Sequence, residues 1–307
     1  MCIDCGCSDG AKATVTNMKT GAVSEIWKDV LGTLHREGRV HSHDHDHNHA
    51  HPHTHSHTHG HGDGHNHTHP HDHAHGVGHD HHHHDHSHSH DHGIVSLEQA
   101  ILSKNDRLAA QNRAWLSGRE VLMLNLVSSP GSGKTSLLER SIRDLKGKID
   151  VAVIEGDQAT ANDGARIASA GAPAIQVNTG TGCHLEADMI ERGLKELRPK
   201  FGSVVFVENV GNLVCPALFD LGEAAKVAIL SVTEGEDKPL KYPHMFRAAS
   251  LVLLNKVDLL PYLDFDVEKA IAYAREVNPS VTVIQTSAKT GAGMEMWYDW
   301  IGAQRKV

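Results

Sequence analysis

The chain has 307 residues, a formal net charge of −9 with histidine counted as neutral, 29 histidines and five cysteines. This length allows one or two domains, and the acidic balance without a basic patch argues against a nucleic-acid partner. No apolar run approaches the ~18 residues of a membrane-spanning helix and no signal peptide is recognisable, so we expect a cytoplasmic protein without a membrane partner.

The N-terminal segment, residues 1–40, opens with MCIDCGC, which places Cys2, Cys5 and Cys7 within six residues. In a reducing compartment, thiols serve as metal ligands more often than as disulfides. Three soft thiolates this close together can wrap one metal ion without a fold. A redox pair or a solvent-exposed tail is the alternative.

Residues 41–93 form a low-complexity tract that holds 26 of the 29 histidines. Because it has almost nothing apolar to bury, we expect it to be disordered without metal. Neutral imidazole suits Ni²⁺, Zn²⁺ and Cu²⁺ alike, so the tract cannot select among these ions. We interpret it as a nickel store of many weak sites, with a solubilising tail as the alternative. Its first ten candidate ligands alternate with other residues: His41, His43, His45, His47, His49, His51, His53, His55, His57 and His59.

Residues 94–307 alternate between strand and helix patterns. A capping box of Ser96 and Gln99 predicts a helix that starts near residue 96. Helical spacing also marks 185–200 and 266–278. Continuous apolar runs predict seven strands, within 120–129, 150–157, 173–179, 203–211, 226–235, 250–258 and 280–288. This alternation predicts an α/β fold, a mostly parallel sheet with helices on both faces.

The first of these strands leads into SSPGSGKTS, a P-loop with Ser128 where the pattern has its first glycine. Backbone N–H groups of such a loop and the following helix N-terminus point at phosphates. Lys134 would reach the β- and γ-phosphates, and the Thr135 hydroxyl would bind Mg²⁺. The whole phosphate-binding set is Gly131, Ser132, Gly133, Lys134, Thr135 and Ser136.

Two later strand ends carry the features of a guanine site. LLNKVD supplies Asn255, Lys256 and Asp258, and TSAKT supplies Ser287, Ala288 and Lys289. A carboxylate at position 258 can accept from both N1–H and the 2-amino group of guanine, whereas adenine lacks that pair of donors. The nucleotide is therefore predicted to be GTP.

Two acidic residues follow other strands at the carboxyl edge of the sheet, where ligands bind in this class of fold. Asp157 ends VIEGD, and we assign it to Mg²⁺ or to the attacking water; a helix N-cap is the alternative. Glu208 ends VFVE in an E-x-x-G pattern, and we expect it on the Mg²⁺ side, with Gly211 sensing the γ-phosphate. The alternative for Glu208 is a solvated strand-end carboxylate.

GTGCHLEAD and ENVGNLVCP follow two neighbouring strand patterns and carry Cys183, His184 and Cys215. If those strands lie close in the sheet, two thiolates and one imidazole form a site for Zn²⁺ or Ni²⁺. Cys215 comes four residues after Gly211, so a loop that tightens on the γ-phosphate would move it. The alternative is two small buried cysteines and a histidine at a helix start.

These motifs together, over roughly residues 95–305, resemble the HypB family, GTPases that assist nickel insertion into nickel–iron hydrogenase. The stretches that carry the resemblance are SSPGSGKTSLLE, GDQATANDGARI, NTGTGCHLEA, VENVGNLVCPA and LLNKVDLLPY. The resemblance implies a P-loop GTPase that dimerises with nucleotide, a metal site shared at Cys183, His184 and Cys215, a nickel site at the C-x-x-C-G-C motif and a nickel store in the histidine tract. It also implies hydrogenase maturation proteins and the hydrogenase large subunit as partners.

The leading interpretation is a GTPase metallochaperone with slow intrinsic turnover, because no glutamine or arginine finger can be assigned. A urease-accessory or zinc-delivery GTPase is the alternative within the fold. CHLEA and NVGNLVCP favour the hydrogenase branch over it. A storage protein with a regulatory GTPase domain is the alternative from another class.

Overall fold

The computed structural model describes residues 13–26, 90–158, 162–180 and 182–305. Cys2, Cys5, Cys7 and the histidines from 41 to 59 lie outside these ranges. Within the described part of the chain, no helix combines the length and apolarity needed to cross a membrane.

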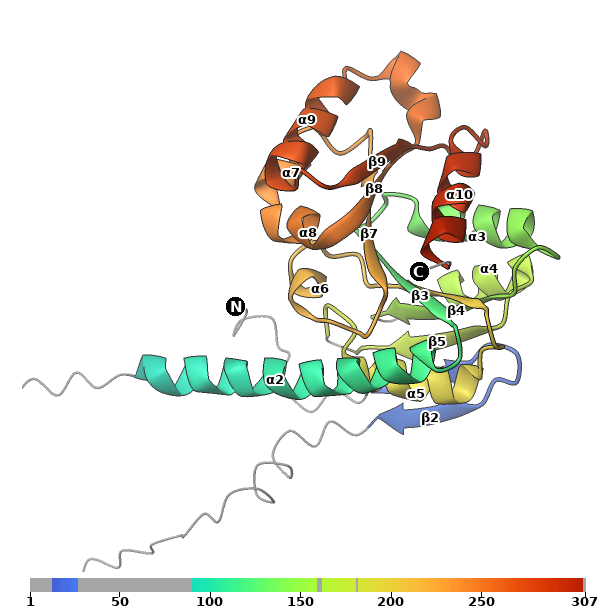
Figure 1. Cartoon of the computed structure of the whole chain (residues 1–307), viewed down its shortest axis with the longest axis vertical. Helices are drawn as coiled ribbons and strands as arrows, with labels where there is room; N and C mark the ends of the chain where they lie inside the picture. The colour runs from blue at the N-terminus through green and yellow to red at the C-terminus, as the bar shows by residue number, and fades with distance from the viewer. Residues whose placement is uncertain (1–12, 27–89, 159–161, 181, 306–307) are drawn as a thin grey trace, which may run out of the picture. The chain divides into compact units, whose positions relative to one another are not determined.

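Nine strands of the described residues form a single mixed sheet in the order β2-β1-β5-β4-β6-β3-β7-β8-β9 (Figure 1). The seven strands predicted from apolar runs are all present and pair in parallel. Their bounds are β3 Leu122–Ser128, β4 Val151–Asp157, β5 Ala174–Asn178, β6 Val204–Glu208, β7 Ala225–Ser231, β8 Ala249–Asn255 and β9 Thr282–Gln285. Most of their residues are buried, as both faces are covered.

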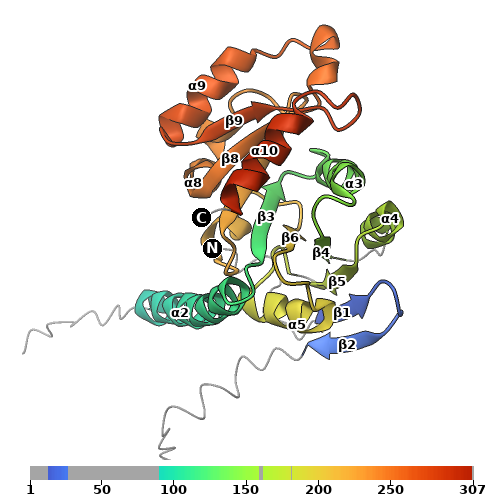
Figure 2. The same ribbon diagram turned by 45° about the vertical axis from the view of Figure 1, so that its right-hand side comes forward.

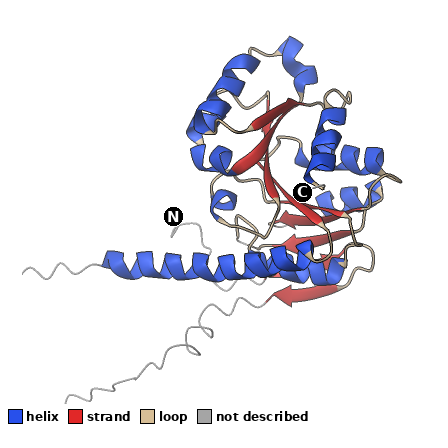
Figure 3. Cartoon of the chain, viewed as in Figure 1, coloured by secondary structure: helices blue, strands red, loops and turns tan. Residues whose placement is uncertain are grey.

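Helices cover both faces of the sheet (Figures 2 and 3). Side chains of α3, α4 and α10 pack against one face of the sheet and form one apolar core. Side chains of α2 and α5 line a second core on the opposite face. Side chains of α8 and α9 line a third core. The helices are α2 His90–Ser117, α3 Lys134–Leu145, α4 Asn162–Ala170, α5 Ala187–Leu197, α6 Cys215–Leu218, α7 Lys238–Lys241, α8 Pro243–Ala248, α9 Val267–Val277 and α10 Met294–Gln304, with the 3-10 turn η2 Val257–Tyr262. This is the predicted α/β arrangement, a P-loop NTPase fold.

A hairpin in the N-terminal segment extends this sheet, which the sequence pattern did not predict. The strands β1 Ala13–Asn17 and β2 Val23–Ile26 are antiparallel, and β1 pairs antiparallel with β5. Ala13 and Val15 are buried in the core that α5 covers. Residues 13–26 thus belong structurally with the GTPase fold, although the histidine tract separates them from it in sequence.

The predicted start of the first long helix was wrong. Helix α2 begins at His90, so Ser96 lies inside it, and the last residues of the tract 41–93 are helical. An N-cap side chain is useful where the first N–H groups lack helical partners. Because a helical turn precedes Ser96, the predicted capping box does not lie at the start of the helix.

Candidate functional site

The P-loop connects β3 to α3, and Gly133 is the N-cap of that helix. Its φ of 96° is in the left-handed region that favours glycine. A Cβ at this position would lie 2.7 Å from Nδ2 of Asn255. The glycine therefore allows both the turn into α3 and the close approach of Asn255, the last residue of β8.

Ser128, which replaces the first glycine of the pattern, has a structural role in this loop. Its Oγ accepts hydrogen bonds from Ser132 Oγ at 2.6 Å and from Lys134 Nζ at 3.0 Å. Lys134 is buried, and this burial lowers its pKa against the opposing effect of the Glu208 charge. Ser128 thus holds the lysine amine over the loop where phosphates would bind.

The predicted guanine-binding residues contact the P-loop and one another. Asn255 Nδ2 donates to Ser132 O at 3.0 Å, and Lys256 Nζ donates to Gly131 O at 2.6 Å. These bonds fix the carboxyl end of β8 and the residue after it to the phosphate loop.

The base-reading part of the site lies in two neighbouring loops. Ser287 Oγ donates to Asp258 Oδ1 at 2.6 Å, so the carboxylate is oriented before any base binds. Ala288 is half-buried beside it, and Lys289 is exposed at the rim. The structure thus brings both motifs of the predicted guanine site together.

Glu208 and Thr135 form the acidic side of the phosphate site. Thr135 Oγ1 donates to Glu208 Oε1 at 2.7 Å. Burial raises the pKa of Glu208 to about 7, against the lowering effects of the Lys134 charge and the Thr135 hydrogen bond. Glu208 Oε2 is also buried, with no hydrogen-bond partner in the described ranges. A buried carboxylate oxygen without a hydrogen-bond partner, next to a threonine hydroxyl, is the kind of hard ligand that Mg²⁺ prefers.

Asp157 ends β4, the strand next to β6 in the sheet. It is half-buried, and its Oδ1 accepts from the backbone N–H of Gln158 at 2.7 Å. It therefore lies at the predicted edge of the sheet, whereas Glu208 is the carboxylate bonded to Thr135.

Glu155 is a buried acid of this edge that the sequence analysis missed. It stands opposite Glu208 in the register of β4 and β6, and it is 2% exposed. Burial raises its pKa to about 9, and the nearby charges of Glu208 and Asp157 raise it further. An acid within the apolar run VAVIEGD was the signal that could have identified it.

Gly211 lies against the P-loop. A Cβ at this position would lie 3.1 Å from Pro130 Cγ and 3.2 Å from Pro130 Cα. The loop that follows Glu208 therefore touches the phosphate loop, and a movement of one would displace the other.

The three predicted metal ligands converge, although β4 lies between the strands that precede them. Cys183 Sγ is 3.0 Å from Cys215 Sγ and 3.6 Å from His184 Nδ1. One ligand atom of each residue lies within 4.8 Å of the others. Two sulfurs and an imidazole nitrogen form the donor set that Zn²⁺ and Ni²⁺ accept.

The imidazole is oriented by its neighbours. His184 Nε2 faces Glu186 Oε1 at 3.8 Å, and the His184 ring packs against Phe219 with centroids 4.0 Å apart. Nδ1 is the ring nitrogen on the side of the sulfurs, 3.6 Å from Cys183 Sγ, so it is the atom that a metal bound there would meet. Neither Glu186 nor Phe219 was identified from the sequence.

The loop that carries Cys183 and His184 is bonded to the loop that follows Glu208. Asn209 Oδ1 accepts from Leu185 N at 3.2 Å, and Asn212 Nδ2 donates to Cys183 O at 3.4 Å. Asn209 Nδ2 also donates to Asn125 Oδ1 of β3 at 3.2 Å. A row of buried amides thus connects the strand before the P-loop with the residues just after Cys183.

Comparisons with known proteins identify the family of this chain. Residues 122–285 match the family described as CobW/HypB/UreG, nucleotide-binding domain. The hydrogenase maturation factor HypB of Escherichia coli is 62% identical over 212 residues, which cover 69% of this chain and 73% of that protein. The hydrogenase/urease maturation factor HypB of Helicobacter hepaticus is 39% identical over 215 residues, or 69% of this chain and 88% of that protein.

Among solved structures, HypB from Helicobacter pylori in complex with nickel superimposes with a TM-score of 0.62 at 37% identity. The similarity covers 66% of this chain and 95% of that one. The family match, the identity to curated relatives and the shared fold agree, so the chain belongs to the HypB hydrogenase maturation factors within the CobW/HypB/UreG nucleotide-binding family.

Proposed function

We propose that this chain is a GTP-hydrolysing nickel metallochaperone, in which the nucleotide controls a metal site at Cys183, His184 and Cys215. One observation supports it most. Glu208, the last residue of β6, is bonded to Thr135 of the P-loop. The loop that follows reaches Cys215, whose Sγ lies 3.0 Å from Cys183 Sγ. The phosphate-site acid and the proposed metal ligand are therefore seven positions apart in the chain.

The nucleotide chemistry follows from the positions of four residues. Glu208 and Thr135, with Asp157 from the next strand, would hold Mg²⁺, which neutralises charge on the phosphates when bound. Lys134, held at Ser128, neutralises the charge that develops on the β–γ bridge. With no glutamine or arginine finger assigned, the intrinsic hydrolysis is slow, and a partner or second protomer supplies the missing activation.

The coupling between nucleotide and metal follows from the loop after β6, which contains Gly211. Its contact with Pro130 would change when a γ-phosphate fills the P-loop, and the shift would carry Cys215 away from or toward Cys183. By linkage, nickel or zinc would change the GTP affinity by the same factor as GTP changes the metal affinity.

The remaining parts of the function concern regions and partners beyond the described site. The C-x-x-C-G-C motif at Cys2, Cys5 and Cys7 binds a nickel ion, and the tract at 41–93 stores several more. Since one protomer offers three ligands at Cys183, His184 and Cys215, a second copy held by GTP would complete the coordination. Other maturation proteins and the hydrogenase large subunit would donate or receive nickel in the cytoplasm.

Delivery to urease is a second candidate function. It is favoured by one observation, the name of the Helicobacter hepaticus relative, which joins hydrogenase and urease maturation. Urease activity in the host, with and without this protein, distinguishes it from a role restricted to hydrogenase.

The proposed function is tested in a host that depends on this protein for hydrogenase activity. Cys215→Ala should abolish the activity in low nickel, and deletion of 41–89 should be rescued by added nickel. A Cys215→Ala strain with normal activity in low nickel would contradict delivery. Failure of added nickel to rescue the deletion would indicate a storage protein instead.

A further inference from the structure

Helix α2 packs on the fold through one face, and two of the buried residues on that face are asparagines. Asn105, Ala109, Asn112 and Leu116 recur four, three and four residues apart, and all are 5% exposed or less. A buried amide side chain is costly without hydrogen-bond partners. The partners of Asn105 and Asn112 therefore show which parts of the fold α2 fixes.

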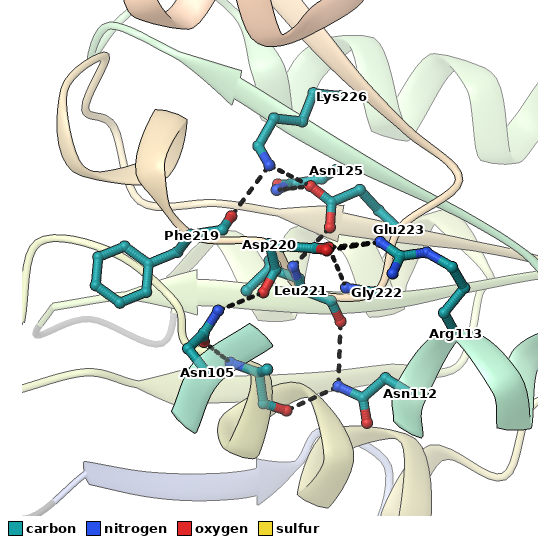
Figure 4. Close-up of polar contacts among 11 residues, drawn as sticks. Asn105, Asn112, Arg113, Asn125, Phe219, Asp220, Leu221, Gly222, Glu223 and Lys226 are labelled. Atoms are coloured by element: carbon teal, nitrogen blue, oxygen red, sulfur yellow. Dashed lines mark hydrogen bonds and ion pairs between the residues drawn. The ribbon is translucent and has the colours of Figure 1, made fainter. Parts of the chain in front are cut away.

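Each asparagine bridges the same two segments, the N-terminus of α5 and the loop 219–223 (Figure 4). Asn105 accepts from Ala187 N at 2.9 Å and donates to Asp220 O at 2.7 Å. Asn112 donates to Ala187 O at 2.8 Å and to Leu221 O at 3.1 Å. The two segments are therefore held to one helix, and through it to each other.

Arg113 adds an ion pair to this contact. Its Nη2 lies 2.7 Å from Asp220 Oδ1 and 2.8 Å from Oδ2, and the guanidinium lowers the pKa of that carboxyl. Asp220 Oδ1 also accepts from Gly222 N at 2.8 Å. A Cβ at Gly222 would lie 2.6 Å from Ala109 O, so only glycine permits this approach of the loop to α2.

The other side of the loop is fixed by residues of the sheet. Lys226 Nζ pairs with Glu223 Oε1 at 2.6 Å and donates to Phe219 O at 3.0 Å. Glu223 Oε2 accepts from Leu221 N at 2.7 Å, and its Oε1 accepts from Asn125 Nδ2 at 3.2 Å. The loop 219–223 is therefore bonded on both sides.

Both segments adjoin His184, one in sequence and the other by contact. Ala187 follows it by three residues, and the Phe219 ring packs on its imidazole at 4.0 Å. Cys215 differs, because it lies before the loop 219–223 and next to Val214, which is 55% exposed. One ligand of the site is thus supported by α2, and another lies on the loop that touches the P-loop.

We propose that Phe219 and the α2 clamp, defined as Asn105, Asn112 and Arg113, are positioning residues that keep the His184 imidazole in place while Cys215 moves with the nucleotide loop. The proposal rests on the proposed metal site at Cys183, His184 and Cys215. It assigns to α2 a role that the GTPase motifs do not include. A fixed imidazole gives the moving thiolate a constant reference, so a shift of Cys215 relative to His184 would change the metal affinity.

The test uses the full chain with Cys2, Cys5 and Cys7 replaced by serine, which leaves Cys183 and Cys215 as its only thiols. Co²⁺ is the probe, because its thiolate charge-transfer band reports these two sulfurs and the histidine tract does not contribute to it. Phe219→Leu should lower the apparent Co²⁺ affinity about 10-fold and change the visible spectrum at saturating metal. Arg113→Ala should lower it about 3-fold, and Arg113→Lys should restore part of the loss.

Two controls separate positioning from folding. Phe246→Leu removes another buried ring, from the third core, and Arg107→Ala removes an exposed arginine from α2. Both should leave the spectrum unchanged, although Phe246→Leu lowers the melting temperature. Phe219→Leu and Arg113→Ala spectra and affinities equal to those of the parent would overturn the proposal. Absence of a thiolate band in the parent would instead overturn the proposed metal site.

Discussion

The nucleotide edge and the metal loop of this protein are specified in different ways. The nucleotide edge is built from short contiguous motifs that already contact each other, as in the bonds from the Asn255 side chain to the Ser132 backbone carbonyl and from Ser287 to Asp258. The proposed metal ligands lie on two loops, one after β5 and one after β6, and one of them, His184, packs against Phe219. The first site is therefore preorganised, whereas the second depends on where its loops lie.

The largest effect is expected at the preorganised site. Asp258→Asn replaces an acceptor of two guanine N–H groups with an amide that can accept only one. We expect GTP affinity to fall about 100-fold or more, because hydrogen bonds to a charged acceptor contribute ~1.5–3 kcal/mol each. Calorimetric titration with GTP measures it, and Asp264→Asn, at an exposed position, is the control. Unchanged GTP affinity would mean that another residue reads the base.

The next largest effect is expected at the proposed metal site. Cys215→Ala removes one of two sulfurs, so the Co²⁺ affinity measured by the thiolate band should fall about 10-fold to 100-fold. GTP affinity of the metal-free protein should stay within twofold, because Lys134, Thr135 and Asp258 are untouched. A matched loss of GTP affinity without metal would show that the two regions are not separable.

A smaller effect concerns the buried acid beside Glu208. Because burial raises the pKa of Glu155 to about 9, its contribution to stability is present below pH ~4.5 and is lost as pH rises through 9. The melting temperature of the nucleotide-free protein should therefore fall from pH 5 to pH 9, and Glu155→Gln, which does not titrate, should reduce that fall. Parallel profiles for the two proteins would contradict the assignment.

The smallest effect is expected on the outer side of the nucleotide edge. Arg166 of α4 pairs with Glu139 of α3 at 3.1 Å and with Asp163 at 3.0 Å, with a side chain 45% exposed. Such pairs contribute less than ~1 kcal/mol, so Arg166→Ala should change the free energy of unfolding by no more than that. Urea denaturation measures it, and a larger loss would indicate that Arg166 has a further partner in the site.

The two regions also differ in how far the sequence predicts them. Lys134, Asn255 and Asp258 follow strands that were recognisable as apolar runs, so spacing alone placed them at one edge. The strand order put β4 between the strands that precede Cys183 and Cys215, and only the fold shows that these loops still meet.

The features that the sequence did not predict depend on tertiary contacts. The hairpin of β1 and β2 has short strands and is separated from its partner β5 by the histidine tract, although alternation in ATVTN was a weak signal. The buried amides Asn105 and Asn112 look like ordinary polar positions of an exposed helix until their partners in α5 and the loop 219–223 are known.

The most direct test of nucleotide control over the metal uses the full chain with serine at positions 2, 5 and 7. The Co²⁺ thiolate spectrum and affinity are recorded with GDP and then with a non-hydrolysable GTP analogue, each with Mg²⁺. We predict that both differ between the two nucleotides and that Cys215→Ala abolishes the difference. Identical spectra and affinities in the two states would contradict the account, because nickel release would then have to be driven by a partner rather than by GTP.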